Sequence, residues 1–180
     1  DNAVTYAKLC YRLDKESGDP DRMSSSLNTL AGIYLGARQP REAEQYIAKA
    51  LSLTDETKNP QRKAVLLGTA SEIYHATGNA QRALQYADAA YSLEVRLGRD
   101  DRAKVRLSQK AAVLLGLHRY REAQQLLVQV IPYFREQGNQ QSLGISCNKM
   151  GMALLSQERP AEALSYYKEA RSEERRVGEE

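Results

Sequence analysis

Two side chains that could share a proton or bind a metal stand three residues apart, Glu72 and His75. In a helix this spacing places them on one face, where a carboxylate and an imidazole can form an acid–base pair or supply two metal ligands. The other histidine, His118, falls in a predicted turn, and neither histidine belongs to a spaced metal motif. A hydrogen-bonded pair on a binding surface is the simpler interpretation.

Other chemical motifs are missing from the sequence. It contains no Cys-x-x-Cys, no His-Glu-x-x-His and no Gly-x-x-x-x-Gly-Lys-Ser/Thr loop for nucleotide phosphates. The two cysteines, Cys10 and Cys147, fall in different predicted repeats, so we expect no disulfide between them, and Cys10 is predicted to fill the core. We therefore expect no catalytic residues, no metal and no cofactor, and an enzyme is the least supported class.

The composition is that of a folded protein with both acidic and basic residues on its surface. The 180 residues are 42% hydrophobic and 27% charged, with a net charge of +3. Arginines are dispersed along the chain, whereas nucleic-acid binders usually concentrate basic residues on one face. No apolar run reaches the length of about 18 residues that a membrane span needs. We therefore expect this segment to bind neither nucleic acid nor membrane.

Alanine recurs at a step of 40 residues, and this period organises the chain. The structural repeat positions are Ala43, Ala83, Ala123 and Ala163, preceded by Ala3. A fixed period of 20 to 50 residues is typical of a solenoid, in which each repeat buries its apolar face against its neighbours. The sequence thus predicts stacked helical repeats with an extended binding surface.

Helical periodicity and turn residues predict an all-α chain. Gly18-Asp19-Pro20 and Asn59-Pro60 are helix start signals, and Gly78-Asn79 and Gly116 mark tight turns. The predicted helices cover residues 3–17, 21–36, 41–57, 61–77, 80–97, 101–116, 120–137, 141–156 and 160–176. We group them into an array over 1–170, with a partial repeat at 1–17 and repeats at 21–57, 61–97, 101–137 and 141–170.

Residues 171–180 form a polar tail outside this array. Arg171 and Glu173 stand where earlier repeats carry large apolar residues. The string from Arg171 to Gly178 also resembles a translated sequencing adapter, and the alternative is a natural polar end to the array. We expect the tail to contribute little to folding, and it is no guide to function.

The repeat columns resemble the tetratricopeptide repeat, in which large, small and aromatic residues alternate through two helices. The first full repeat supplies Leu27, Leu30, Ala31, Tyr34, Ala43, Ile47 and Ala50, and the second supplies Leu67, Ala70, Ser71, Tyr74, Gly78, Ala83, Ala87 and Ala90. Lys110 and Cys147 depart from the pattern. The resemblance implies a right-handed α-solenoid, and its long units are similar to those of bacterial peptide-sensing regulators and motor light chains.

The same resemblance implies a peptide-binding groove, because the first helix of each repeat lines the concave face in this family. The residues carried over to that groove are Asn28, Thr29, Glu72, His75, Gln109, Asn148, Lys149 and Met152. Amide side chains both donate and accept hydrogen bonds, so they can bind a peptide backbone without reading its sequence. Solvated amides on an exposed face are the alternative interpretation.

Two functions follow as hypotheses. The first is a non-catalytic scaffold that binds a protein or peptide partner through the concave groove. The second is the ligand-sensing part of a bacterial transcription regulator or sensor kinase whose effector domain lies outside this sequence, since the chain begins inside a repeat. Uncovered ends of the array also predict self-association.

Overall fold

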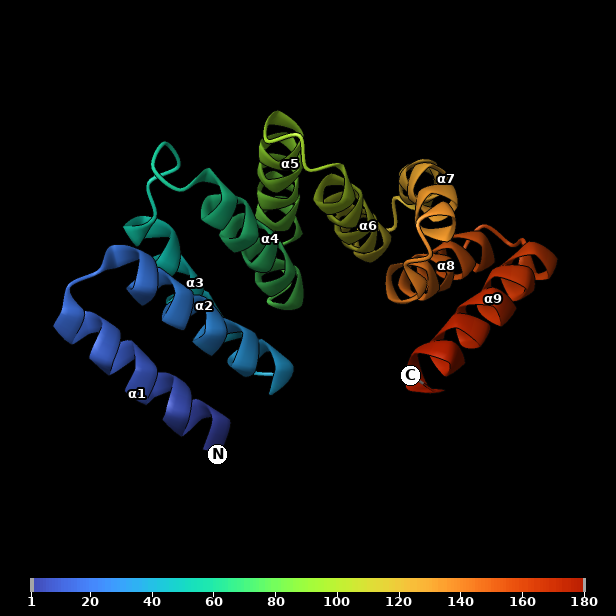
Figure 1. The fold of residues 1–180 in the computed structure, drawn as a ribbon. Helices are drawn as coiled ribbons and strands as arrows, with labels where there is room; N and C mark the ends of the chain where they lie inside the picture. The colour runs from blue at the N-terminus through green and yellow to red at the C-terminus, as the bar shows by residue number, and fades with distance from the viewer. Residues whose placement is uncertain (1, 180) are drawn as a thin grey trace. The chain divides into compact units, whose positions relative to one another are not determined.

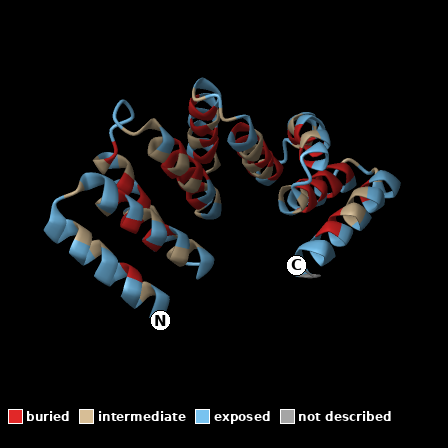
Figure 2. Cartoon of the chain, viewed as in Figure 1, coloured by how far each residue is buried: buried red, intermediate tan, exposed pale blue. Residues whose placement is uncertain are grey.

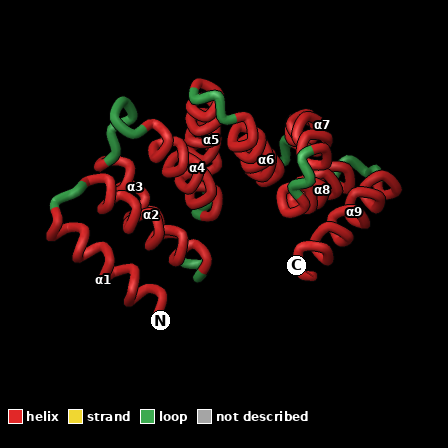
Figure 3. Tube along the Cα trace, viewed as in Figure 1, coloured by secondary structure: helices red, strands yellow, loops and turns green. Residues whose placement is uncertain are grey.

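The computed structural model describes residues 2–179, and in that range it contains nine α-helices and no strand (Figures 1 and 3). Contacts divide the chain into two units, residues 1–99 and residues 100–180. The first unit holds α1 (Asn2–Ser17), α2 (Pro20–Gly36), α3 (Pro40–Leu53), α4 (Pro60–Ala76) and α5 (Ala80–Arg96). The second holds α6 (Asp100–Gly116), α7 (Tyr120–Glu136), α8 (Gln140–Leu155) and α9 (Pro160–Glu179).

Helix starts follow the predicted signals. The carboxylate of Asp19 accepts hydrogen bonds from the backbone N–H groups of Asp21 at 2.9 Å and Arg22 at 3.3 Å. Asn59 caps α4 in the same way, through the N–H of Arg62 at 3.1 Å. These caps satisfy N–H groups that have no partner within the helix, and the following proline needs none.

The turn between the two helices of each repeat places one residue in the left-handed conformation, again at a step of 40. These residues are Arg38, Gly78, His118 and Glu158, with φ between 58° and 81°. The prediction that Gly116 marks the third turn is wrong in its position, because Gly116 is the last residue of α6 and His118 adopts the positive φ. Backbone bonds from the His118 and Arg119 N–H groups to the last carbonyls of α6 fix that conformation, so three of the four turns form without glycine.

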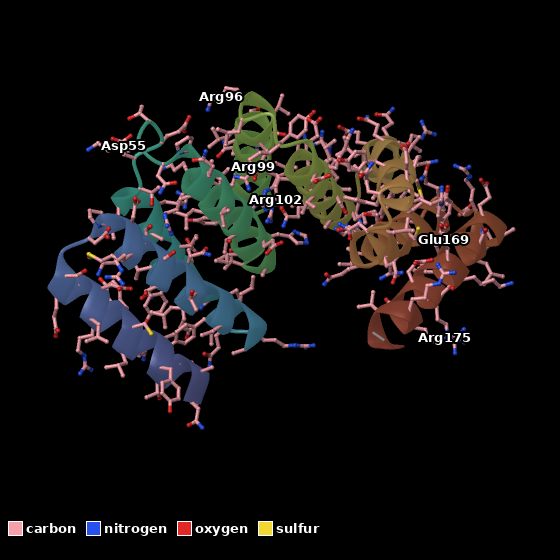
Figure 4. The ribbon with its side chains drawn as sticks, viewed as in Figure 1. Asp55, Arg96, Arg99, Arg102, Glu169 and Arg175 are labelled. Atoms are coloured by element: carbon pink, nitrogen blue, oxygen red, sulfur yellow. The ribbon has the colours of Figure 1, made fainter. Side chains whose placement is uncertain are left out.

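Helix α3 ends at Leu53, four residues before the predicted end at 57. The loop that follows satisfies its own polar groups: the Asp55 carboxylate accepts from the Thr57 N–H at 2.8 Å and the Thr57 hydroxyl at 2.7 Å. These bonds hold the pKa of Asp55 below its usual value. The Lys63 ammonium donates to the carbonyls of Leu51 and Thr54, so carbonyl groups at the end of α3 are satisfied without a further helical turn. Figure 4 labels Asp55 in this loop.

The core is a series of helix crossings rather than a single centre, and buried residues follow the helix sides that face their neighbours (Figure 2). Ala43, Ala83 and Ala123 are completely buried and Ala163 is 1% exposed, as the repeat period predicts for a packing position. Within each of two repeats a pair of tyrosine rings stacks, Tyr34 on Tyr46 and Tyr74 on Tyr86, and the ring centroids of each pair are 5.2 Å apart.

Helix α1 leaves several of its apolar side chains exposed. Tyr6 and Leu13 are 69% and 55% exposed, although the equivalent Tyr46 and Tyr86 stack within their repeats. The prediction that Cys10 fills the core is wrong, because its thiol is exposed. The physical reason is position: α1 packs on α2 through Ala7, and of the other described helices α3 reaches it through side chains alone, with the Lys49 ammonium 5.0 Å from the centroid of the Tyr11 ring.

The polar tail is helical. Helix α9 runs from Pro160 to Glu179 without a break at residue 170, three residues beyond the predicted end at 176. Glu173 is 7% exposed, and its Cβ lies 3.4 Å from the position a Cβ would take on Gly144 of α8. The small Gly144 thus lets the first turn of the tail pack on α8.

Candidate functional site

In each unit the first helices of neighbouring repeats touch. Helix α2 contacts α4 in residues 1–99, and α6 contacts α8 in residues 100–180. The second helices behave differently, since within the described residues the Cα atoms of α3 stay more than 8 Å from those of α5, and the Cα atoms of α7 from those of α9. We call the solvent-facing side of α2 and α4, and likewise that of α6 and α8, the first-helix face of its unit.

All eight predicted groove residues lie on these first helices, and none is buried. Thr29, Glu72 and Asn148 are exposed, Met152 is 47% exposed, and the other four are half-buried. They fall into two sets, one on each unit. The first set is Asn28, Thr29, Glu72 and His75, and the second is Gln109, Asn148, Lys149 and Met152.

A pocket of about 300 Å³ opens on the first-helix face of residues 1–99. Its lining combines hydrogen-bonding groups with two apolar side chains, and it lies where α2 meets α4. The lining residues are Ser25, Asn28, Asn59, Gln61, Arg62, Val65, Leu66 and Arg99. Of the predicted site residues, the structure thus brings Asn28 into a defined cavity.

Two polar atoms at this pocket are buried and make no hydrogen bond to another described residue, Asn28 Oδ1 and Arg62 Nε. The Arg62 guanidinium is held in place by a hydrogen bond to the Ser25 hydroxyl and by Asp21, whose Oδ1 lies 3.7 Å from Arg62 Nε. A buried polar atom without a partner costs about 1–3 kcal/mol. The Asp21 carboxylate offsets part of this cost for Arg62 Nε, whereas a ligand that donates to Asn28 Oδ1 would recover the cost for the amide.

Arg99 supplies the other cation of the pocket. Its Nε lies 3.3 Å from Oε2 of Glu94, a carboxylate whose side chain is fully buried in the same unit (Figure 4 labels Arg99). Arg62 and Arg99 were not predicted as site residues from the sequence, because arginines dispersed along a sequence are expected on a solvated surface. The available signal was the place of Arg62 in the first turn of α4, two residues after Pro60 of the Asn59-Pro60 cap.

The first-helix face of residues 100–180 is tied together by its own side chains. The Lys149 ammonium donates to the Ser108 carbonyl at 2.8 Å and lies 3.1 Å from the Ser108 hydroxyl, which is 2.9 Å from that of Ser146. Gln109 accepts a hydrogen bond from Arg106 at 2.8 Å. Lys149 therefore links α8 to α6, and Asn148 and Met152 are the predicted residues that extend furthest into solvent here.

Among residues 2–179, no group of three or more potential metal-ligating side chains comes together. Within the same range, no helix has both the length and the apolar character that a membrane crossing needs.

Comparisons with known proteins agree with this repeat geometry. Models described as tetratricopeptide repeat match residues 22–94 and residues 145–177. No curated protein matches the sequence significantly. Among solved structures, BtubC (BKLC) from P. vanneervenii is 16% identical with a TM-score of 0.77, over 94% of this chain and 71% of that one.

Two more structures share the fold at the same low identity. A Podosopora anserina protein that has been assigned as a kinesin light chain, with nearly identical TPR-like repeats, is 16% identical with a TM-score of 0.72, over 98% of this chain and 87% of that one. MamA is 16% identical with a TM-score of 0.65, over 94% of this chain and 88% of that one. The helix pairs, the buried alanine columns and the two family matches together show that this chain belongs to the tetratricopeptide repeat family.

Proposed function

We propose that the chain is a non-catalytic scaffold that binds an extended peptide of a partner protein on its first-helix face. The repeat fold supports a protein-interaction scaffold in general. The observation that carries the finer proposal is the pocket between α2 and α4, where the buried Asn28 Oδ1 and Arg62 Nε make no hydrogen bond to another described residue.

The chemistry of those two atoms favours a peptide group as ligand. Asn28 Oδ1 accepts a hydrogen bond and Arg62 Nε donates one, while a peptide unit carries one N–H and one carbonyl. Val65 and Leu66 add apolar contact beside these polar groups. A pocket of about 300 Å³ is at the lower end of the usual range for ligand pockets, so it suits one or two side chains of a longer segment.

A selection from a random 12-residue peptide phage library tests this proposal. The library is first depleted on the Asn28→Ala/Asn148→Ala double variant of the full chain and then selected on the unmodified chain. We expect enriched peptides that bind the unmodified chain and lose at least fivefold in affinity for the double variant. Equal binding to both proteins by every enriched peptide would refute the proposed face.

Matched variants on the second helices complete the test. Gln45 and Gln85 are exposed glutamines at equivalent positions of α3 and α5, so Gln45→Ala and Gln85→Ala remove an amide without touching the first-helix face. We expect these controls to bind the selected peptides with unchanged affinity. Circular dichroism of each variant verifies that the helical fold is intact.

A further inference from the structure

A second and larger hollow, of about 1020 Å³, lies outside the first-helix face. One side of α7 and the turn that joins α8 to α9 form it, so it belongs entirely to residues 100–180. We call it the glutamine crevice. Its lining residues are Arg121, Gln124, Gln125, Val128, Gln129, Gln157 and Arg159.

The crevice exists because the second helices diverge. Helices α7 and α9 both pack on α8, but within the described residues their Cα atoms stay more than 8 Å apart. Further along, the Arg135 guanidinium donates to the Glu169 carboxylate at 2.8 and 3.1 Å and so links α7 to α9 (Figure 4 labels Glu169). The packing on α8 thus separates α7 from α9 at the crevice, and an ion pair joins the two helices beyond it.

Two of its amides are held in a fixed arrangement. Gln157 Nε2 donates to Gln124 Oε1 and to the Ala153 carbonyl, both at 3.0 Å. These bonds use the Gln157 NH2 and the Gln124 carbonyl, and they leave the Gln124 NH2 and the Gln157 side-chain carbonyl without a hydrogen bond to another described residue. Side by side, a donor and an acceptor complement the carbonyl and N–H of a peptide backbone.

The lining differs from the same columns in the other repeats. Val128 is 56% exposed, whereas the residues 40 and 80 positions earlier and 40 later are Asp88, Ala48 and Lys168. Gln129 likewise stands where the neighbouring repeats carry Lys49, Ala89 and Glu169. This repeat alone thus combines neutral amides with an exposed branched apolar side chain at these positions.

The charge of the crevice is positive. No carboxylate lines it, and Arg159 is held by two hydrogen bonds of 2.7 Å to Glu162. Arg121 makes no hydrogen bond or ion pair with another described residue, and it is exposed at the N-terminal end of the crevice. An acidic group on a ligand would therefore meet an available guanidinium there.

We propose that the glutamine crevice is a second binding site, which takes an extended acidic peptide segment of a partner protein. A backbone amide of the segment bonds to the Gln124–Gln157 pair, a small apolar side chain covers Val128, and an acidic side chain pairs with Arg121. From residue 121 to 129 the α7 face spans about 12 Å at 1.5 Å per residue. That length matches roughly four residues of extended chain.

Peptide selection with a different depletion step tests this site. The random 12-residue phage library is depleted on the Val128→Asp variant of the full chain, whose added carboxylate repels an acidic segment, and then selected on the unmodified chain. Aspartate occupies the same column at Asp88, so this change should preserve the fold. We expect enriched peptides that contain an acidic residue, and we expect Gln124→Ala and Arg121→Ala each to weaken their binding at least fivefold.

Control variants separate this site from the first-helix face. Ala48→Asp places aspartate in the same exposed column of α3, and Asn28→Ala/Asn148→Ala alters the first-helix face; both should leave these peptides bound with unchanged affinity. The proposal is overturned if no peptide is enriched after depletion on Val128→Asp. It is also overturned if the enriched peptides are lost with the Asn28→Ala/Asn148→Ala variant but not with Gln124→Ala.

Discussion

Four small side chains set how closely the helices of the repeats approach. Ala43, Ala83, Ala123 and Ala163 are at most 1% exposed, and the hydroxyl of Ser71 donates to the carbonyl of Ala83 at 2.9 Å. A helix crossing this close holds no space for a longer side chain.

Leucine at these positions should therefore destabilise the fold. We expect Ala83→Leu and Ala123→Leu each to lower the free energy of unfolding by about 1–3 kcal/mol, because the added methylenes force the helices apart. Ala89→Leu is the matched control, since Ala89 is exposed on the same helix as Ala83. Urea unfolding followed by circular dichroism measures all three, and equal stability of buried and exposed variants would contradict the packing role.

Two helical glycines should respond in opposite directions to alanine. A Cβ on Gly151 of α8 would lie 2.7 Å from Cε1 of Tyr167, whereas a Cβ on Gly32 of α2 would meet nothing within 4 Å. Alanine favours the helix by about 1 kcal/mol over glycine, so Gly32→Ala should raise the midpoint of thermal unfolding. Gly151→Ala should lower it.

Removing the aromatic ring provides the control for that prediction. In a Tyr167→Ala background the clash is gone, and Gly151→Ala should then stabilise the protein as Gly32→Ala does. If Gly151→Ala lowers the midpoint equally with and without the ring, contact with Tyr167 is not the cause.

At this scale the sequence predicts packing better than polar contacts. The 40-residue period identifies the buried alanines, because steric demand recurs in every repeat. It does not reveal that Lys149 bonds to Ser108 or that Arg62 lines a pocket, since each of these contacts occurs in one repeat and depends on side-chain conformations.

Among the helix ends, too, some are predictable from the sequence and others are not. Helix starts are predictable because caps such as Asp19 and Asn59 act within three residues. The end of α3 at Leu53 is not, because Lys63 from the next helix bonds to its last carbonyls. Likewise, Arg38, His118 and Glu158 adopt a positive φ in their turns, which their residue types do not predict.

Helix α9 carries the prediction about the tail. Beyond Ala170, one buried side chain, Glu173, faces α8, and its carboxylate pairs with the exposed Arg176 at 3.2 Å. Because the Arg176 side of this pair is 62% exposed, we expect it to stabilise by only about 0–1 kcal/mol, as ion pairs at the surface do. We expect a chain that ends at Ala170 to melt within roughly 2–4 °C of the full chain, as about 1 kcal/mol implies for this size.

Differential scanning calorimetry of the two chains measures this effect. A much larger loss would make residues 171–180 an essential part of α9 and its packing on α8. Glu173→Gln in the full chain is the control, because it keeps the shape of the side chain and removes the charge that pairs with Arg176.

For the whole molecule, the uncovered side of α1 predicts self-association. Tyr6, Leu9 and Leu13 are 69%, 45% and 55% exposed, and exposed apolar residues clustered on one helix favour contact with another surface. We expect the weight-average mass measured by light scattering to rise with protein concentration. Tyr6→Glu/Leu13→Glu should abolish the rise, and a monomer at every concentration would contradict the prediction.

The central claim is that the first-helix face binds the peptide, and isothermal titration calorimetry tests it most directly. The titrant is a synthetic peptide obtained after depletion on the Asn28→Ala/Asn148→Ala variant. We predict that Asn28→Ala weakens binding by about 1–3 kcal/mol, the cost of removing a hydrogen-bonding partner at a buried contact, while Gln45→Ala and Gln85→Ala leave the Kd unchanged. A larger loss for Gln45→Ala or Gln85→Ala than for Asn28→Ala would contradict the account.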